Sequence, residues 1–586
     1  MTRPMIRKLV LASAAMTLVV GIAYALTQQV VPADAGGTCL NSLTTAEFNT
    51  WFDAGAVSLN GAVKPANSVL FPDIPNCSFY KWSEQMFLWL TSPAPPRYGS
   101  RGGLIMNTPA FYDVTPPDAM GRRKFVPHTS GFLRVFNLRA SQKGFLDLPI
   151  ILEKRTLRVL EILPTPMSRE GRQIVADLTG NQVEIGRAIR TESGKAIFFD
   201  PSGREIQGAR ALLQPELARK IEALKFFDRT ELVQRITLDD KSIVSLDLFG
   251  NFAETEQGQA DGRVLMAQNG SLVYYALIVN NVFALYRTMQ GASVPAGTKF
   301  PLTQADLDAV TDFAAANGQP PVIDPEALAI EIKSAWIEAS SLDDPSQFIQ
   351  MKATVPTYDT SDPNDWVQNG TKTTTLAMVG MHVVGSTGST NPQNFNDGHP
   401  EMLWATFEHL SNGPTAAYSY TKTPSGTGNI GENAPGDWLF ASNGSTGPFN
   451  VPHMKPLNFM PGHLVSEPPF TISPSDTRRE MPWGLNGTSS SLNAQVISIN
   501  NKVRSLLDPA DVRRNYIHIG TTWTKFGLDP FDPNNPNNPT ANQVGTNKLS
   551  NTTMETYTQG GNCFNCHGPN NSTTVSHIFD TTDPLF

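Results

Sequence analysis

The chain has 586 residues and a formal net charge of −8 at pH 7, and charged residues make up only 17% of it. No tract of Lys and Arg interrupts this mildly acidic composition, which excludes nucleic acid as an expected partner. The length exceeds what one small hydrophobic core requires, so we expect about two to four domains or one large elaborated domain.

The first 25 residues have the pattern of a secretory signal peptide. Three basic residues precede an apolar run over 9–25, which ends in the small-residue motif Ala23-Tyr24-Ala25. The alternative is an uncleaved anchor over residues 9–26, because the run is nearly long enough to span a bilayer. Either reading predicts a periplasmic or otherwise exported body, with membrane association only if the segment stays uncleaved.

Cys39 and Cys77 are the first two of the four cysteines. In an oxidising compartment we expect them to form a disulfide that fastens the mature N-terminus to the body. The alternative, a redox-active pair, lacks the Cys-x-x-Cys spacing typical of such sites.

The N-terminal half contains four recognisable element patterns. A helix is predicted over 81–90, where Trp82, Met86 and Trp89 share one face and indicate core packing. Further patterns predict two strands around a turn at 183–199 and an amphipathic helix that opens at its proline at 215–229. A hairpin around an Asn-Gly turn is predicted at 264–279.

The patterns continue into the C-terminal half. Thr303 is the expected N-cap of a helix over 303–315, and Asp306 completes a pattern that resembles a capping box. Residues 329–333 alternate like a half-buried strand. A buried strand, a helix and a second strand are then predicted at 375–386, 493–507 and 515–522.

Frequent Gly and Pro, 45 of each, predict many turns and short strands, so we expect a strand-rich α+β fold with several domains. A turn-rich stretch over 355–365 suggests a domain boundary. The expected order is an N-terminal body at 26–355 and a loop-rich second body at 356–528. A Pro/Asn-rich crossover at 529–545 and a short, largely helical or irregular haem segment at 546–586 are expected to follow.

The most informative motif is Cys563-Phe564-Asn565-Cys566-His567, close to the C-terminus. Cys-x-x-Cys-His is the attachment pattern of a c-type haem, because two thiols on one helical turn can each add to a haem vinyl group. The adjacent His567 can then bind the iron from one side. The sequence therefore predicts one covalent haem c, held by Cys563 and Cys566 with His567 as the proximal ligand. The alternative is a pair of surface thiols beside a histidine.

Only nineteen residues follow His567, which is too few to wrap a haem, so its cover is expected to come from upstream. The placement differs from small cytochrome c and resembles cytochrome c′ and cytochrome P460, in which the sixth iron position is often open or weakly held. Segments 381–385, 399–409 and 551–556 also resemble large exported bacterial cytochrome-like proteins with one C-terminal haem motif. That second resemblance implies no particular activity.

Four residues are candidates for the distal side of the haem. His577 follows His567 by ten residues, and Met554 precedes the motif. His382 and His409 lie upstream, where a buried structural role is the alternative for His382. Water or no ligand at all remains a further alternative.

Two other patterns carry little weight. His399, Glu401, Glu408 and His409 could form a separate metal site, but their spacing matches no zinc signature, and a polar rim or a surface helix is the favoured interpretation. The G-x-G-x-x-G pattern at 426–431 lies in a Ser/Thr/Pro loop without a following helix, so we reject a dinucleotide site there.

Electron transfer is the first functional expectation, because one covalent haem is a one-electron relay tuned by its ligands and burial. The partner would be a redox protein or a small-molecule oxidant or reductant. A haem-centred oxidoreductase with an open sixth position, using peroxide, oxygen or nitrogen-oxide chemistry, is the alternative. A haem-based gas-binding or scaffold protein is the third class.

Overall fold

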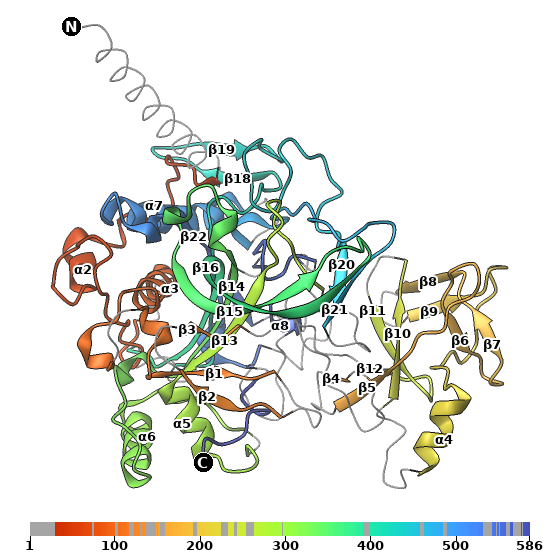
Figure 1. Ribbon diagram of the computed structural model, residues 1–586. Coiled ribbons are helices and arrows are strands. Elements are labelled where there is room, and N and C mark those ends of the chain that lie inside the picture. The colour runs from red at the N-terminus through yellow and green to blue at the C-terminus, as the bar shows by residue number, and fades with distance from the viewer. Residues whose placement is uncertain are drawn as a thin grey trace, which may run out of the picture.

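The structure is a computed structural model, and it describes residues 30–586 apart from several short stretches (Figure 1). Those stretches are 73–75, 100–102, 117–121, 129–131, 136–147, 149, 153–158, 191–195, 224–231, 240–242, 254–262, 296, 391–397, 457–461, 485–488, 531–541, 547, 550, 558, 560–562, 567–575 and 577.

A 12-stranded sheet forms the centre of the molecule, with the strand order β2-β1-β13-β14-β16-β17-β22-β23 along its main path. Its pairings are antiparallel except for β3 with β15. The strands are β1 (Phe111–Val114), β2 (Phe125–Pro127), β3 (Phe132–Leu133), β13 (Tyr274–Asn280), β14 (Ile330–Glu338), β15 (Gln350–Asp359), β16 (Asp365–Thr387), β17 (His399–His409), β20 (Met454–Pro456), β21 (His463–Ser466), β22 (Tyr516–Thr524) and β23 (Gln543–Gly545). The expected strand-rich body with some helices is confirmed.

Both faces of the central strands are covered. All eleven residues of β17 and all nine of β22 are buried. β14 is also buried on both faces, so the predicted half-buried strand over 329–333 was wrong in its exposure. The alternation there reflects polar groups that find buried partners, such as Glu331 with Ser576 (2.6 Å), rather than a face turned to water.

One face of the sheet is covered by α3 (Cys77–Leu90) and α7 (Ser490–Leu506). The helices predicted over 81–90 and 493–507 are therefore confirmed, and Trp82, Met86 and Trp89 are all buried. Phe87 of α3 stacks on Phe407 of β17, with ring centroids 4.4 Å apart. The aromatic stripe of α3 is core packing, as its spacing indicates.

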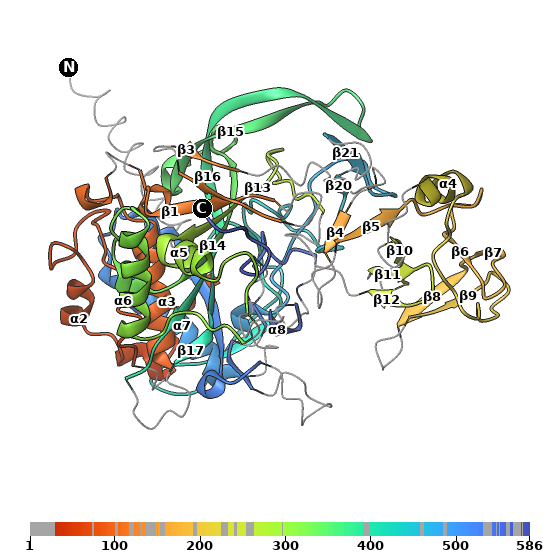
Figure 2. The same ribbon diagram turned by 90° about the horizontal axis from the view of Figure 1, so that it is seen from below.

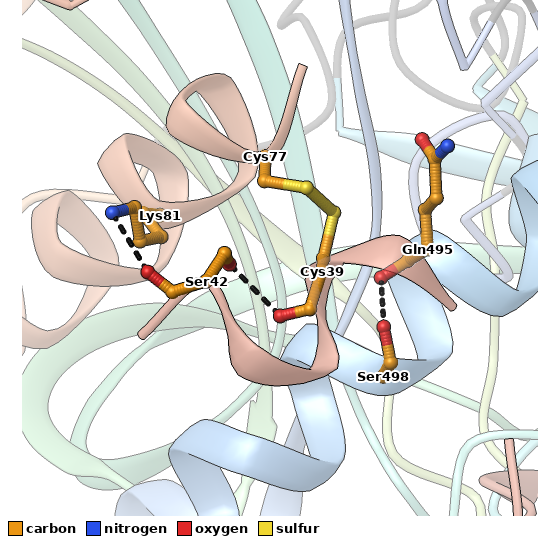
Figure 3. The surroundings of a disulfide bond; sticks show 6 residues. All are labelled: Cys39, Ser42, Cys77, Lys81, Gln495 and Ser498. Atoms are coloured by element: carbon orange, nitrogen blue, oxygen red, sulfur yellow. Dashed lines mark hydrogen bonds between the residues drawn. A yellow bond between two sulfur atoms is a disulfide. The ribbon is translucent and has the colours of Figure 1, made fainter. Parts of the chain in front are cut away.

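Cys39 and Cys77 form the predicted disulfide, with their Cα atoms 5.4 Å apart (Figure 3). The bond joins the segment before α2 (Thr45–Thr50) to the first residue of α3. Lys81 makes a second tie by donating to the carbonyl of Ser42 (3.1 Å). Closing a loop of 38 residues stabilises the fold by about 4 kcal/mol in the chain-entropy model.

Two further helices, α5 (Asn281–Met289) and α6 (Gln304–Ala316), lie side by side beyond β13 (Figure 1). The predicted cap of α6 is confirmed as a full capping box. Thr303 Oγ1 accepts from the backbone N–H of Asp306 (3.2 Å), and the Asp306 carboxylate accepts from that of Thr303 (2.8 Å).

Replacing Thr303 with Ala should lower the free energy of unfolding by about 1 kcal/mol, because the N–H of Asp306 loses its acceptor. Denaturant unfolding monitored by circular dichroism measures the change. Thr303→Ser keeps the hydroxyl and serves as the control, which should unfold close to the parent protein. Equal losses in both variants would contradict a role for the cap.

The boundary predicted at 355–365 corresponds to the tip of a hairpin. β15 and β16 pair antiparallel over the whole of β15, from Gln350 opposite Ala377 to Asp359 opposite Val367. The same sheet therefore contains strands of both predicted bodies, which corrects that boundary. Turn residues between two strands and turn residues between two domains look alike in sequence, and only strand pairing distinguishes them.

A small lobe is inserted between β3 and β13 and lies beside the main sheet in both views (Figures 1 and 2). It has its own apolar clusters, one around Phe198 and another around Ile221 of α4 (Pro215–Ala223). Its strands are β4 (Ile150–Leu152), β5 (Val159–Leu163), β6 (Ile174–Ala176), β7 (Gln182–Glu184), β8 (Arg187–Arg190), β9 (Ala196–Phe199), β10 (Leu232–Thr237), β11 (Ile243–Asp247) and β12 (Phe252–Ala253).

One turn recurs three times in the lobe, at 177–181, 200–204 and 247–251, each with the pattern Asp-x-x-Gly. In every copy the Asp Oδ1 accepts from the backbone N–H groups two and four residues later, at 2.8–3.0 Å. The glycine has a φ of +84° to +90°, which favours residues without Cβ. No internal repeat was predicted from the sequence.

The glycine-rich pattern at 426–431 lies on a two-stranded hairpin of β18 (Tyr418–Thr421) and β19 (Thr427–Ile430). No helix follows it, in agreement with our rejection of a dinucleotide site. Within the part of the chain that the structure describes, no helix combines the length and apolar character needed to cross a membrane.

Candidate haem-attachment site

The helix α8 (Cys563–Cys566) forms one turn, so the two predicted thiol positions begin and end the same turn of backbone. Cys563 is half-buried and Phe564 is fully buried. Phe564 meets Trp404 of β17 edge to face, with ring centroids 6.4 Å apart, and shares a core cluster with Val384 of β16. His567 and the side chain of Cys566 lie outside the described residues. The motif is thus fastened to the central sheet through its second residue.

The segment before the motif is held to the same sheet. Asn551 donates to Thr406 Oγ1 and to the carbonyl of Phe407, both at 2.9 Å. The carbonyl of Thr553 accepts from the hydroxyl of Tyr275 (2.7 Å). Gly380 makes this approach possible, because a Cβ there would lie 2.3 Å from Thr553 Oγ1.

Glu408 anchors this segment at the centre of a buried ion pair. Its carboxylate pairs with Arg479, and the exposed fractions of the two side chains are 0% and 2%. It also accepts from the backbone N–H of Thr552 (3.0 Å) and from the amide of Asn412 (3.3 Å). Glu408, which the sequence analysis considered but disfavoured as a metal ligand, therefore has a structural role.

The tail after the motif is also packed into the body. Phe579 is fully buried against α5, and its carbonyl accepts from Arg287 Nε (2.8 Å). Arg122 pairs with Asp583 (2.7 Å) near the C-terminus. The Cys-x-x-Cys-His motif consequently lies between two stretches, around 551–557 and 578–586, that are both fixed to upstream elements.

The sheet face beneath α8 can be described as rows of directly opposed residues, whose side chains lie on the same face. In the first row, Val384 of β16 stands between Glu331 of β14 and Trp404 of β17. Two residues near the C-terminus contact this row, because Phe564 packs on Trp404 and Ser576 donates to Glu331.

In the second row, His382 stands between Lys333 and Thr406. Residues two apart on a strand lie about 6.6 Å apart, so His382 is one short step from the first row. Its Nε2 lies 2.7 Å from Glu555 Oε1, with the exposed fractions of the two side chains at 14% and 31%. Neither Nδ1 of His382 nor the ammonium of Lys333 has a hydrogen-bond partner among the described residues.

His409 is a poor candidate for the distal side. Ser411 engages its Nδ1 (2.7 Å), the carbonyl of Gln347 lies 3.2 Å from its Nε2, and the ring stacks on Phe348. Burial lowers the pKa of His409 to about 3, so the ring is neutral. With both nitrogens occupied, this imidazole has no free lone pair for iron.

Met554 is buried in a separate apolar cluster with Val379 and Phe440. This placement agrees with the alternative of core packing. His577, the remaining candidate, lies outside the described residues. Of the four distal candidates, His382 is therefore the one whose placement on the sheet face under α8 can be described.

The separate metal site is contradicted for the described residues. His399 lies 2.9 Å from Glu401, which also accepts from Thr524 (2.7 Å), whereas Glu408 and His409 belong to the opposite end of β17. No group of three or more His, Cys, Asp or Glu side chains with metal-binding proximity occurs in the described ranges. The expected rim or surface helix is instead a buried strand, whose polar side chains are paired.

Glu331, Lys333 and Glu555 were missed by the sequence analysis. Glu331 and Lys333 alternate with isoleucines in a strand, which is typical of an exposed face. Glu555 precedes Cys563 by only eight residues, and this proximity was the one signal that could have drawn attention to it.

The donor set fits a covalent haem, since two thiol positions on one helical turn are followed immediately by an imidazole. Comparison with known proteins found no matching family model, no matching curated protein and no matching solved structure. Function must therefore be argued from the site itself.

Proposed function

We propose that this chain is an exported c-type haem protein that acts as a redox protein in electron transfer. The observation that carries the proposal is the single helical turn from Cys563 to Cys566, fastened to the sheet by Phe564 and followed by His567. A haem bound there would supply one-electron chemistry. Cys563 and Cys566 would hold it covalently, and His567 would bind its iron.

The remaining residues of the site would set the surroundings of the haem. Phe564 and Trp404 exclude water on one side of α8, and a low dielectric strengthens nearby electrostatic interactions. The stretches fixed on either side of the motif would keep it from moving away from the sheet. An oxidant or reductant, either a protein or a small molecule, is the partner we expect.

An exported location follows from the N-terminal pattern and is compatible with the Cys39–Cys77 disulfide. We propose a periplasmic or otherwise exported location. Intact mass measurement of the natively expressed protein tests this, because cleavage after residue 25 removes a defined mass. Recovery of reduced, uncleaved protein from the cytoplasm would contradict it.

Replacing both Cys563 and Cys566 with Ala should abolish covalent haem, because no thiol remains to add to the vinyl groups. Denaturing mass spectrometry and acid–acetone extraction of the exported protein measure the attachment. Replacing Cys39 and Cys77 together is the matched control, which removes two cysteines and should leave the haem bound. Haem that resists extraction from the first variant would refute the proposal.

His567→Ala should change the spin state or reduce haem attachment, because the proximal imidazole is lost. The absorption spectra of the ferric and ferrous protein report this change. A spectrum identical to that of the parent protein would exclude His567 as the proximal ligand.

A haem-centred oxidoreductase with an open sixth position is the second candidate function. It is favoured by the occupation of both nitrogens of His409 and by the burial of Met554 in a separate apolar cluster. Carbon monoxide distinguishes the two functions. A low-spin haem that does not bind CO favours electron transfer alone, and a high-spin haem that binds CO favours chemistry at the iron.

A further inference from the structure

The sequence contains seven Asn-Gly pairs, and asparagine in this dipeptide can lose ammonia without an enzyme. The backbone nitrogen of the glycine attacks the side-chain carbonyl carbon of the asparagine, and no side chain on the glycine crowds that nitrogen. The structure describes six of the pairs, which begin at Asn60, Asn269, Asn317, Asn369, Asn412 and Asn443. The attack needs a free amide side chain and a free glycine nitrogen, so the hydrogen bonds of the folded protein decide which pair reacts.

Five of these pairs have an asparagine whose side chain is held by a hydrogen bond. The partners are Val512 for Asn60 (3.2 Å), Ser271 for Asn269 (3.2 Å), Phe313 for Asn317 (2.9 Å), Thr357 for Asn369 (2.7 Å) and Val379 for Asn412 (2.7 Å). Each of these bonds must break before the side-chain carbonyl carbon can turn toward the glycine nitrogen. Asn412 is also completely buried, out of reach of solvent hydroxide.

The glycine nitrogen is engaged as well in three of the five pairs. The backbone N–H groups of Gly61, Gly270 and Gly318 donate to carbonyl oxygens at 2.9–3.1 Å. A nitrogen attacks only after it has lost its proton, and an N–H that donates to a carbonyl keeps that proton more firmly. These pairs are therefore protected at both reacting groups.

Asn443 and Gly444 differ from the other five pairs. They are the two central residues of a turn that the N–H of Ser445 closes by donating to the carbonyl of Ser442 (3.0 Å), and both are exposed. Gly444 has a φ of +73°, with open space around the position of a Cβ. Neither the side chain of Asn443 nor the N–H of Gly444 forms a hydrogen bond within the part of the chain that the structure describes. Both reacting groups are thus free.

Asp476 fixes the two ends of this turn and leaves its tip free. Its carboxylate accepts from the backbone N–H of Ser442 (2.7 Å) and from the hydroxyl of Ser445. It also accepts from the side-chain amide of Gln268 (3.1 Å), so the turn lies beside the 267–271 turn that contains Asn269. One restrained and one free Asn-Gly turn therefore occur at the same place on the molecule.

We propose that Asn443 is a site of spontaneous deamidation. The nitrogen of Gly444 loses its proton to hydroxide and bonds to Cγ of Asn443. The Cγ–Nδ2 bond breaks, and the leaving nitrogen takes a proton from water to depart as ammonia. Water then opens the five-membered imide at either carbonyl carbon, which leaves aspartate or isoaspartate at position 443. One water is consumed, one ammonia is released, and the chain gains one negative charge beyond its formal −8.

Ageing of the folded, full-length exported protein at 37 °C and pH 8 tests the proposal, with peptide mass spectrometry that separates aspartate from isoaspartate. Asn443 should convert about tenfold faster than each of the other five described pairs, the factor that corresponds to one hydrogen bond that need not break. The same protein unfolded in guanidinium is the control. There all Asn-Gly pairs should react at similar rates, because the fold no longer distinguishes them.

Asn443→Gln should remove the added charge, because glutamine would have to close a six-membered ring, which forms more slowly. Isoelectric focusing should therefore show an acidic band in the aged parent protein that is missing from the aged variant. The proposal is overturned if Asn269 or another described pair converts as fast as Asn443 in the folded protein. It is equally overturned if Asn443 stays intact for the time in which the unfolded chain converts completely.

Discussion

Replacing Arg479 with Met should lower the free energy of unfolding by about 3 to 5 kcal/mol. Arg479 neutralises Glu408, whose side chain has no exposed surface, and it also donates to the carbonyl of Gly413 (2.8 Å). Met fills a similar volume, so the loss comes mainly from leaving one carboxylate buried without a counter-charge. Denaturant unfolding at neutral pH measures it.

The same substitution should loosen the stretch before the Cys-x-x-Cys-His motif, because Glu408 also accepts from the backbone N–H of Thr552. Hydrogen exchange of residues 551–557 should therefore increase more than exchange in the distant lobe. The double variant R479M/E408Q removes both charges and should regain part of the lost stability. A loss below about 1 kcal/mol in R479M would show that Glu408 is not dependent on this partner.

Replacing Glu84 with Gln should remove a large pH dependence of stability. Glu84 lies in α3, and its Oε1 is 3.8 Å from Nδ1 of His518 in β22, too far for a hydrogen bond. Neither atom has a hydrogen-bond partner in the described part of the chain. Burial raises the pKa of Glu84 to about 8, against the opposing charge of Arg504, and burial lowers the pKa of His518 to about 3. Both groups are therefore neutral at pH 7, so the contact is not an ion pair.

The direction of the effect follows from the raised pKa of Glu84. The unfolded chain releases this proton near pH 4.5, whereas the folded protein keeps it until about pH 8. Stability is thus fully present below pH 4.5 and declines as the pH rises to 8, by about 3 to 5 kcal/mol in total. Gln does not titrate, so Glu84→Gln should be more stable than the parent at pH 8 and close to it at pH 5.

Guanidinium unfolding of the parent and Glu84→Gln at pH 5, 6, 7 and 8 tests this expectation. Glu47→Gln is the matched control, because its carboxylate is exposed and pairs with Lys81 at the surface. The free energy of unfolding of Glu47→Gln should change with pH in parallel with that of the parent. The explanation fails if the free energy of unfolding of Glu84→Gln falls with pH as steeply as that of the parent.

Local sequence predicted several of the single elements because their signals are local. The capping box of Thr303 and Asp306 requires only a hydroxyl and a carboxylate three residues apart, and α6 begins there. The aromatic spacing of α3 required only a helical period. The disulfide was predictable because only two cysteines lay outside the Cys-x-x-Cys-His motif.

The arrangement of those elements could not be read in the same way. The stretch at 355–365 contains the turn residues of a hairpin and of a linker alike, and only the pairing of β15 with β16 resolves them. The half-buried exposure expected for β14 failed because Glu331 is paired with Ser576, a residue 245 positions away. Polar residues mark an exposed face only when no buried partner exists.

The sequence by itself determined the Cys-x-x-Cys-His pattern, the disulfide and several individual helices and strands, because each depends on residues close together in the chain or on a unique pair of thiols. Only the tertiary structure decided that His382 pairs with Glu555, that Glu408 pairs with Arg479, and that both ring nitrogens of His409 have partners. The physical reason is that a side chain's role depends on which partners satisfy its hydrogen bonds and charge. In a sheet of this size those partners come from strands and segments far apart in the chain.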